Sequence, residues 1–306
     1  MKQQLPKRRQ DEIRFTQNFL RDPALVEKLI AKAGIRSGET VLEIGPGKGI
    51  ITKALAKAVG VEGQVIAVEL DPSLAARLET EFASAPQVKI VAGDILAFDR
   101  ASLPVGYKVF ANVPFNITSA LLEYLFDDHA GLTAAYLILQ TETLFALGER
   151  GANLETFKSL LIKPFYTIEI EHRFQRSDFS PPPGVDTALF RFERRTVPLI
   201  DSGEYDLYKD FLAFVSKDRV GEGVWQRVLS RQQIQTLIDQ AGIVFGRGLK
   251  LQPVDAIAAA FRSFAAGSKA KHAVVKGAMA SLRAEQSRHE QINRSGGHRR
   301  PQQHRE

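Results

Sequence analysis

Between residues 15 and 200, short apolar runs alternate with longer stretches in which apolar side chains recur every three or four positions. The short runs are typical of buried strands, and the longer stretches are typical of amphipathic helices. Strands that alternate with helices indicate βαβ units, so the pattern predicts an α/β fold with a parallel sheet. The predicted strands are Thr40–Ile44, Gln64–Val68, Val88–Val91, Tyr107–Ala111 and Ala134–Leu139.

Capping and turn residues set the ends of the predicted helices. Asp22-Pro23 and Asp71-Pro72 each place a capping aspartate before a proline at the first helical position. A helix over Ile50–Val59 is closed by Gly60. Further helices are expected over Thr118–Phe126, with Thr118 as the cap, and near Glu142–Leu147.

The pattern changes in the second half of the chain. Lys163–Phe174 and Thr187–Phe192 alternate like two antiparallel strands, and after Asp206 only helical spacing remains. From Gly267 the chain is poor in apolar residues, so no structure is predicted there. The late helices are expected over Leu207–Val215, Gly223–Ser230, Gln232–Ala241 and Pro253–Phe264.

Composition narrows the class of protein. The 306 residues, 44% of them hydrophobic, are enough for about two domains. No stretch offers the roughly 18 apolar residues of a membrane span, and Met1–Arg9 lacks the apolar core of a signal peptide, so we expect a cytoplasmic protein without membrane association. The absence of cysteine excludes disulfides, thiolate metal sites and thiol nucleophiles, and we predict no metal site.

The net charge of +6 is concentrated at the two ends of the chain. Residues 267–306 hold nine Lys or Arg against three Glu, and residues 1–14 hold five basic against two acidic residues. Such basic ends can bind phosphate backbones through counterion release, although a solvated tail is the alternative. We predict a basic arm at 1–14, a catalytic domain at 15–200, a helical RNA-binding domain at 201–266 and a basic disordered tail at 267–306.

The first predicted strand runs directly into the glycine turn Gly45-Pro46-Gly47-Lys48-Gly49. Glycines permit a tight turn and let a ligand approach the backbone beside a helix N-terminus, as in doubly wound cofactor-binding folds. Glu69, at the tip of the next strand, can accept both hydroxyls of a ribose. Asp94, after the third strand, could accept an adenine amine, although a turn role is the alternative.

Asn112-Val113-Pro114-Phe115 follows the fourth predicted strand. The amide oxygen and the Val113 carbonyl can accept hydrogen bonds from an exocyclic amine, proline fixes the backbone that presents the carbonyl, and the Phe115 ring can stack on a base. A later proline-rich loop carries Phe179, which either covers a bound base or packs in the core. The helical region adds Arg219, Arg227, Arg231 and Arg247 as surface cations.

From Gln17 to about Phe264 the chain resembles the ribosomal RNA adenine-N6 methyltransferases, which use S-adenosylmethionine. The resemblance implies a Rossmann-like S-adenosylmethionine-dependent methyltransferase domain with a small C-terminal helical domain. It differs mildly from the family pattern at Val113 and Lys48. The motifs that carry it are Gln17–Leu20, Glu43–Gly49, Val68–Asp71, Gly93–Ile95, Asn112–Phe115 and Phe179–Pro183. By the same resemblance the cofactor site comprises Asn18, Leu20, Gly45, Gly47, Glu69, Asp94 and Asn112, and the catalytic site comprises Asn112, Val113, Pro114, Phe115 and Phe179.

Two branches of this family compete. The erythromycin-resistance branch methylates one adenine in the peptidyl-transferase region of 23S rRNA, and the housekeeping branch dimethylates two adjacent adenines of 16S rRNA. The Gln-Asn-Phe-Leu lead-in, the absence of an Arg-Arg-Lys run in the helical domain and the tail composition favour the resistance branch. We therefore expect a monomer that acts on 23S rRNA and confers macrolide, lincosamide and streptogramin B resistance.

Two other classes remain as alternatives. A nicotinamide dehydrogenase could use a similar glycine turn, but it would leave the Asn112 motif without a role. A noncatalytic nucleic-acid-binding relative is also conceivable, although every expected site group is retained. Binding of S-adenosylhomocysteine rather than NAD would exclude the first, and methyl transfer to RNA would exclude the second.

Overall fold

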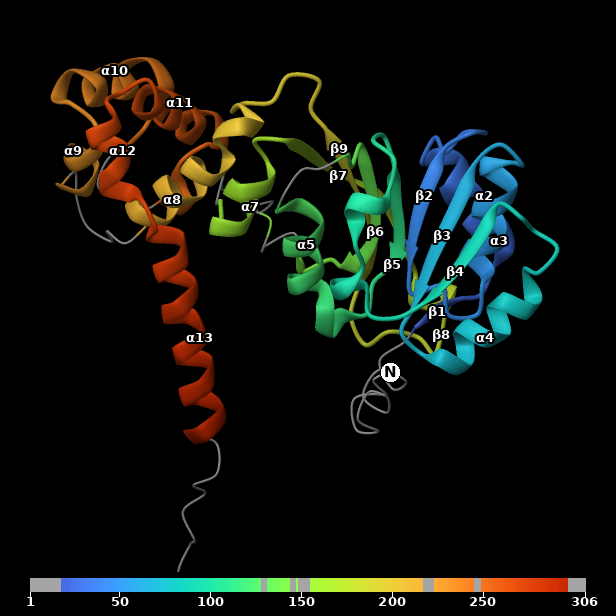
Figure 1. The fold of residues 1–306 in the computed structure, drawn as a ribbon. Coiled ribbons are helices and arrows are strands. Elements are labelled where there is room, and N and C mark those ends of the chain that lie inside the picture. The colour runs from blue at the N-terminus through green and yellow to red at the C-terminus, as the bar shows by residue number, and fades with distance from the viewer. Residues whose placement is uncertain are drawn as a thin grey trace, which may run out of the picture. The chain divides into compact units, whose positions relative to one another are not determined.

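The computed structural model describes residues 18–127, 131–143, 147, 155–216, 223–244 and 249–296 (Figure 1). The chain divides into two compact units. The first comprises residues 1–146 and 165–198, and the second comprises residues 147–164 and 199–306. Residues 147–164 therefore belong with the helical unit, although the sequence pattern placed them in the catalytic domain. Among the described residues, no helix is both long and apolar enough to cross a membrane.

The first unit is built on a seven-stranded sheet with the order β4-β3-β2-β5-β6-β9-β7. Strands β2 to β6 run parallel, whereas β9 runs antiparallel to both β6 and β7. The predicted parallel sheet and the antiparallel pair are both confirmed, and together they form a Rossmann-like fold. The strands are β2 Thr40–Ile44, β3 Gln64–Glu69, β4 Val88–Ala92, β5 Lys108–Asn112, β6 Ala134–Gln140, β7 Tyr166–Arg173 and β9 Thr187–Arg194.

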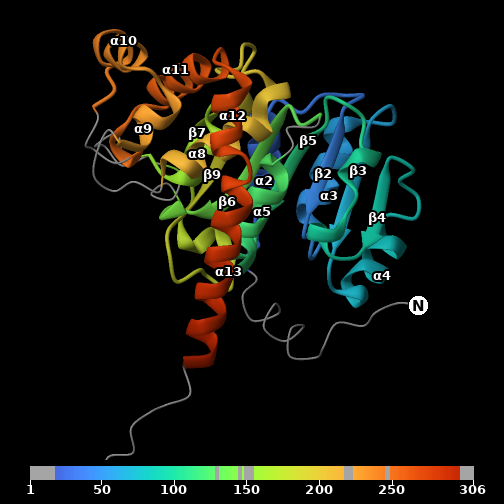
Figure 2. The same cartoon turned by 60° about the vertical axis from the view of Figure 1, so that its left-hand side comes forward.

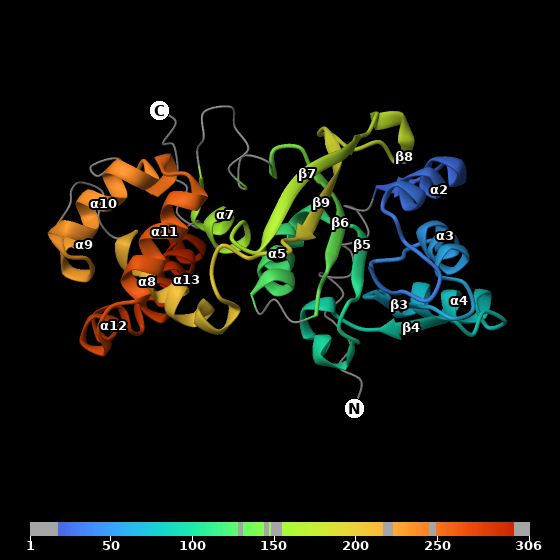
Figure 3. The same cartoon turned by 90° about the horizontal axis from the view of Figure 1, so that it is seen from above.

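Helices cover both faces of this sheet, with α2 and α3 on one face and α5 on the other (Figure 3). Val41, Val65, Phe110 and Tyr136 point from successive strands into one core cluster with the apolar side chains of α2 and α3. Burying each such side chain stabilises the fold by roughly 1.5–3 kcal/mol. This core cluster therefore keeps the strands, and with them the strand ends, in fixed positions relative to one another. The helices are α2 Pro23–Lys32, α3 Ile50–Val59, α4 Pro72–Glu81 and α5 Thr118–Phe126.

The predicted caps are largely confirmed. Asp22 accepts from the backbone N–H of Ala24, and Asp71 accepts from that of Ser73, which starts α2 and α4 respectively. Thr118 is the exception, because it is the first residue of α5 and makes no side-chain cap. A 3₁₀ turn before it, η3 Phe115–Ile117, already leads the chain into the helix. The other 3₁₀ turns of this unit are η1 Ile95–Ala97, η2 Arg100–Ser102 and η4 Arg176–Asp178.

A second, two-stranded sheet joins segments that are far apart in the sequence. Strand β1, Phe19–Leu20, pairs antiparallel with β8, Phe179–Ser180. The pairing sets Leu20 opposite Phe179. The sequence motifs suggested a role for each segment, but their pairing follows only from the tertiary fold.

The second unit is helical, and its core consists of aromatic side chains. Tyr208, Phe211, Phe261 and Phe264 are fully buried and contact one another edge to face or stacked. The helices are α7 Phe157–Ile162, α8 Tyr205–Val215, α9 Gly223–Val228, α10 Arg231–Ala241, α11 Val254–Ala265, α12 Lys269–Val275 and α13 Ala278–Gly296, with 3₁₀ turns η5 Ser202–Glu204 and η6 Leu249–Leu251.

The disorder predicted from Gly267 onward is wrong for residues 269–296. Here α12 and α13 form, and α13 packs against α8 (Figures 1 and 2). Asp210 of α8 accepts from the backbone N–H groups of Gly277 and Met279 at 2.8 and 2.9 Å and so caps α13 from another helix. A polar sequence can be helical when tertiary contacts fix its first turn, and the hydrophobic pattern cannot show this.

Several expectations lie outside the described residues. These concern the basic arm at 1–14, the residue Gln17, most of the helix near Glu142–Leu147, and the side chains of Arg219 and Arg247.

Candidate active site

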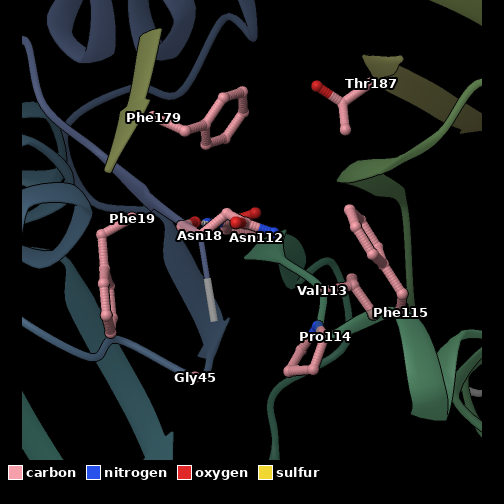
Figure 4. Close-up of a pocket in the computed structure, with 9 residues that line it drawn as sticks. All are labelled: Asn18, Phe19, Gly45, Asn112, Val113, Pro114, Phe115, Phe179 and Thr187. Atoms are coloured by element: carbon pink, nitrogen blue, oxygen red, sulfur yellow. Dashed lines mark hydrogen bonds between the residues drawn. The ribbon is translucent and has the colours of Figure 1, made fainter. Parts of the chain in front are cut away.

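A pocket lies in the first unit at the carboxyl ends of the central strands, where the connection order reverses between β2 and β5. Ligands of open α/β sheets bind at such a switch point. The non-atom space here, open solvent included, measures about 450 Å³. Its lining comprises Asn18, Phe19, Gly45, Asn112, Val113, Pro114, Phe115, Phe179 and Thr187 (Figure 4).

Asn112, the last residue of β5, lies in the middle of this pocket. Its amide nitrogen donates to the backbone carbonyl of Asn18 at 2.6 Å, which turns the side-chain oxygen away from that contact. The Val113 N–H donates to the Ile138 carbonyl at 3.2 Å. No described residue donates to the Asn112 side-chain oxygen or to the Val113 carbonyl, so two acceptors remain for a ligand.

Pro114 and Phe115 extend this arrangement. Pro114 has a φ of −60° and an extended ψ of 129°, so the chain leaves β5 in a fixed direction before η3 begins at Phe115. The Phe115 ring lines the pocket beside Val113 (Figure 4). The sequence-predicted catalytic residues of this motif therefore do come together.

The sequence left two interpretations of Phe179 open, covering a bound base or packing in the core, and its position in the structure is compatible with both. The residue is 1% exposed, belongs to the core cluster and packs edge-on against Phe174 with ring centroids 5.2 Å apart. Its ring also lines the pocket, on the far side from Pro114 (Figure 4). Packing against Phe174 thus holds one face of the ring while another part stays available to a ligand.

Thr187 lines the pocket and was missed by the sequence analysis. It starts β9 just after the proline-rich loop that carries Phe179. Its position in the stretch Pro183-Gly184-Val185-Asp186-Thr187, where a loop enters a strand at the sheet edge facing the site, was the available signal.

Glu69 and the glycine turn form a connected structure next to the pocket. The two carboxylate oxygens of Glu69 accept from the backbone N–H groups of Gly47 at 3.0 Å and Asp71 at 2.9 Å. Burial raises the pKa of Glu69, whereas the hydrogen bonds from Asp71 and Gly47 act in the opposite direction. The carboxylate therefore shapes the turn besides offering acceptors to a ligand.

The two glycines of the predicted cofactor turn have different surroundings. Gly45 has a φ of +67° and nothing within 4 Å of the place where a Cβ would stand, so its backbone is open to a ligand. A Cβ on Gly47 would lie 2.5 Å from the Phe19 ring and clash with it, so only glycine fits at this position. The Lys48 ammonium also lies over this ring, 5.0 Å from its centroid.

Four predicted cofactor residues lie outside the pocket lining. Leu20, Gly47 and Glu69 are buried, and Asp94 is half-buried at the end of β4. One Asp94 carboxylate oxygen caps η1 by accepting from the Leu96 N–H at 3.0 Å, so the turn role considered for Asp94 is confirmed. No described residue binds the other oxygen, which stays available.

Glu43 is an unusual buried acid at the end of β2. It is 1% exposed, and neither carboxyl oxygen has a hydrogen-bond partner among the described residues. The pKa of Glu43 is raised to about 8, chiefly by burial; the nearby Thr52 hydroxyl acts in the opposite direction, and the charge of Glu69 adds a smaller increase. Glu43 is therefore protonated in the folded chain at neutral pH.

The chain matches a family model described as ribosomal RNA adenine dimethylase over residues 8–266. The chain belongs to this family. It is therefore an S-adenosylmethionine-dependent rRNA adenine methyltransferase, and the predicted fold, cofactor and reaction class are confirmed at this level.

Its relatives come from both branches of the rRNA adenine dimethylase family. Ribosomal RNA small subunit methyltransferase A of Geobacter sulfurreducens is 34% identical over 200 residues, which is 63% of this chain and 71% of that protein. An rRNA methyltransferase of Streptomyces thermotolerans is 33% identical over 209 residues, 68% of this chain and 66% of that protein. The crystal structure of the 23S rRNA methyltransferase ErmE matches with a TM-score of 0.69 and 25% identity, covering 81% of this chain and 100% of that one.

The strand ends fit the family's cofactor. The open backbone at Gly45 after β2, the Glu69 carboxylate at the tip of β3 and the free Asp94 oxygen after β4 offer, in order along the sheet edge, a close approach and two acceptors. S-adenosylmethionine is an amino acid joined to a nucleoside, and such a ligand needs both a close approach to the backbone and hydrogen-bond acceptors.

Glu43→Gln should flatten the dependence of stability on pH. Because Glu43 ionises in the unfolded chain near the usual glutamate pKa of 4.5 but only at about 8 in the folded chain, folding takes up a proton between these values. The free energy of unfolding therefore falls as pH rises through this window, on the order of 1 kcal/mol per pH unit. Urea unfolding at pH 5.5, 6.5 and 7.5 measures this slope.

In that experiment the Gln variant should gain stability over the wild type towards pH 7.5. The exposed Glu62 of the β2–β3 region provides the control, since Glu62→Gln should keep the wild-type slope. Equal slopes for Glu43→Gln and the wild type would contradict a protonated buried Glu43.

Proposed function

We propose that the pocket holds the target adenine with its N6 amine between the Asn112 side-chain oxygen and the Val113 carbonyl. The observation that carries this proposal is the pair of unused acceptors beside the rings of Phe115 and Phe179. A flipped base loses its stacking in the RNA, and aromatic side chains replace that stacking in the pocket.

The two acceptors compensate for the low nucleophilicity of the adenine amine. The lone pair of the adenine amine is delocalised into the ring, which makes the amine a poor nucleophile. Hydrogen bonds from both N–H groups to Asn112 and Val113 favour a tetrahedral nitrogen with its lone pair free. Catalysis therefore comes chiefly from positioning, and no general base is needed for the attack.

The cofactor supplies a methyl group on a sulfonium. The N6 lone pair forms the new N–C bond as the S–C bond breaks, and N6 then loses a proton to water. We assign Glu69 to the ribose hydroxyls, Asp94 to the cofactor adenine, and Asn18, Gly45 and Asn112 to the amino-acid end. Leu20 and Gly47 support this site from the buried side, through the β1–β8 pairing and the Phe19 contact.

The comparison with known proteins changes which of the two ribosomal substrates is favoured. The sequence patterns favoured 23S rRNA, whereas the names of the sequence relatives, chiefly small subunit methyltransferases A, support small-subunit rRNA better. We therefore propose small-subunit rRNA as the first candidate, acted on in the cytoplasm. The match to the 23S rRNA methyltransferase ErmE, which covers that whole chain, supports 23S rRNA as the second candidate, for which the sequence resemblance implied antibiotic resistance.

Transfer of a labelled methyl group tests the function and separates the two substrates. Protein-free 23S rRNA and 30S subunits are incubated in parallel with the enzyme and labelled S-adenosylmethionine. Label on 30S subunits alone would support the first candidate, and label on free 23S rRNA would support the second. Label on neither RNA would refute the proposed function.

The C-terminal segment beyond Arg283 is proposed to add RNA affinity without affecting the cofactor. Because Val275 and Ala278 are buried, removing all of 267–306 would damage the helical unit, so a cut after Arg283 is the better variant. Residues 284–306 carry five Arg and three Glu, so the cut should weaken RNA binding several-fold and make it less salt-dependent. Binding titrations at two salt concentrations measure this effect, and equal RNA affinity for both proteins would contradict the proposed role.

A further inference from the structure

Thr187 is a buried polar residue that the proposed mechanism does not use. It is 4% exposed, and its hydroxyl makes no hydrogen bond to any described residue, although its backbone carbonyl accepts from the Phe174 N–H. The hydroxyl oxygen itself is not fully buried, so a molecule in the pocket can reach it. A hydroxyl in the lining of a ligand pocket that has no partner in the protein can form a hydrogen bond with the ligand.

The sheet register places Thr187 across the end of β6 from Asn112. On one side of β6, Asn112 pairs with Ile138, and on the other side Thr187 pairs with Gln140. Neighbouring strands lie about 4.8 Å apart, so the two residues stand about 10 Å apart across the strands, with the pocket between their side chains. A planar ring whose amine is held at Asn112 extends into this space.

The close-up shows how the side chain is turned. The Thr187 methyl group points towards the Phe115 ring, and its hydroxyl oxygen lies on the side of the Phe179 ring (Figure 4). The hydroxyl therefore faces the Phe179 side of the pocket (Figure 4). The β6–β9 pairing and the buried Phe179 fix this position.

We infer that the Thr187 hydroxyl donates a hydrogen bond to a ring nitrogen of the target adenine. This inference rests on the proposed function. Once the N6 amine faces Asn112 and Val113, the remaining polar atoms of an adenine ring are nitrogen lone pairs, which need a donor. A hydroxyl can supply that donor, whereas the nearby Phe115 and Phe179 rings cannot.

Two substitutions at one position test the inference. Thr187→Val keeps the branched shape and removes the donor, and Thr187→Ser keeps the donor. We expect kcat/KM for methyl transfer to RNA to fall about tenfold in the Val variant, the usual effect of one hydrogen bond, and to stay within about threefold in the Ser variant. The affinity for S-adenosylhomocysteine, measured by calorimetry, should be unchanged in both.

Thr52→Val is the matched control, because Thr52 is a buried threonine that lies on α3 outside the pocket lining. It should leave kcat/KM for RNA unchanged. A purely structural role of Thr187 would lower thermal stability and cofactor affinity together with activity.

Substrates with a single atom changed give the decisive measurement. RNA carrying 1-deaza-, 3-deaza- or 7-deazaadenine at the target position lacks one ring nitrogen at a time. For one of the three, the wild type should lose about tenfold in kcat/KM and Thr187→Val should lose nothing further, which is the signature of a shared contact. Equal losses in both proteins for all three analogues, or a fully active Thr187→Val, would overturn the inference alone. Failure of the wild type to methylate any rRNA would instead refute the proposed function.

Discussion

Asn112→Ala is expected to lower methyl transfer by on the order of 100- to 1,000-fold, because it removes one of the two acceptors proposed to hold the adenine amine. The variant should still bind S-adenosylhomocysteine measurably, since the Glu69 and Asp94 contacts are intact. Single-turnover transfer of labelled methyl measures the first effect, and calorimetry measures the second.

Two further variants sharpen this test. Asn116, an exposed neighbour in η3, provides the matched control, and Asn116→Ala should transfer methyl groups at the wild-type rate. Asn112→Asp keeps the oxygen acceptor but loses the donor to the Asn18 carbonyl, so it should retain more activity than Asn112→Ala. Wild-type activity in Asn112→Ala would refute the assignment of this residue.

Glu69→Gln is expected to weaken S-adenosylhomocysteine binding by roughly 10- to 100-fold. The carboxylate accepts from both Gly47 and Asp71, whereas an amide has one acceptor oxygen and would turn an NH₂ group towards one of these N–H groups. The expected loss of affinity corresponds to one hydrogen bond between a ligand hydroxyl and a charged acceptor, roughly 1.5–3 kcal/mol. Calorimetric titration measures the binding.

The pH dependence gives an independent check on Glu69. Because burial raises the pKa of Glu69, its carboxylate takes up a proton at a higher pH than an exposed glutamate does, and the protonated form is a weaker acceptor. Cofactor affinity of the wild type should therefore fall as pH is lowered, and this fall should be smaller in Glu69→Gln. Asp71→Asn, which keeps an oxygen for the Ser73 N–H, should bind S-adenosylhomocysteine nearly as tightly as the wild type. Wild-type affinity in Glu69→Gln would contradict the role of the carboxylate.

The strand-to-turn transitions at Gly45, Glu69, Asp94 and Asn112 could be predicted because each combines local signals. A buried apolar run followed by glycine, an acid or an amide identifies the carboxyl end of a strand, and parallel strands bring these ends to one edge of a sheet. The caps at Asp22 and Asp71 were equally local, since the side-chain oxygen of an aspartate before proline accepts from a backbone N–H two residues on and so starts the helix. The family assignment and its cofactor rest on the same residues.

The sequence by itself determined the strands, most caps and the Asn112 motif, because hydrophobic period, capping and turn chemistry act within a few residues. Only the tertiary structure decided which distant groups meet. It pairs β1 with β8, brings Thr187 into the pocket across β6, sets the Phe19 ring on Gly47 and caps α13 with Asp210. Each of these contacts joins residues that are far apart in the sequence, so no local sequence pattern links them. Each forms only when complete helices and strands pack together. The pKa of Glu43 has the same origin, because burial by the assembled sheet and helices, rather than any neighbour in sequence, keeps that carboxyl protonated.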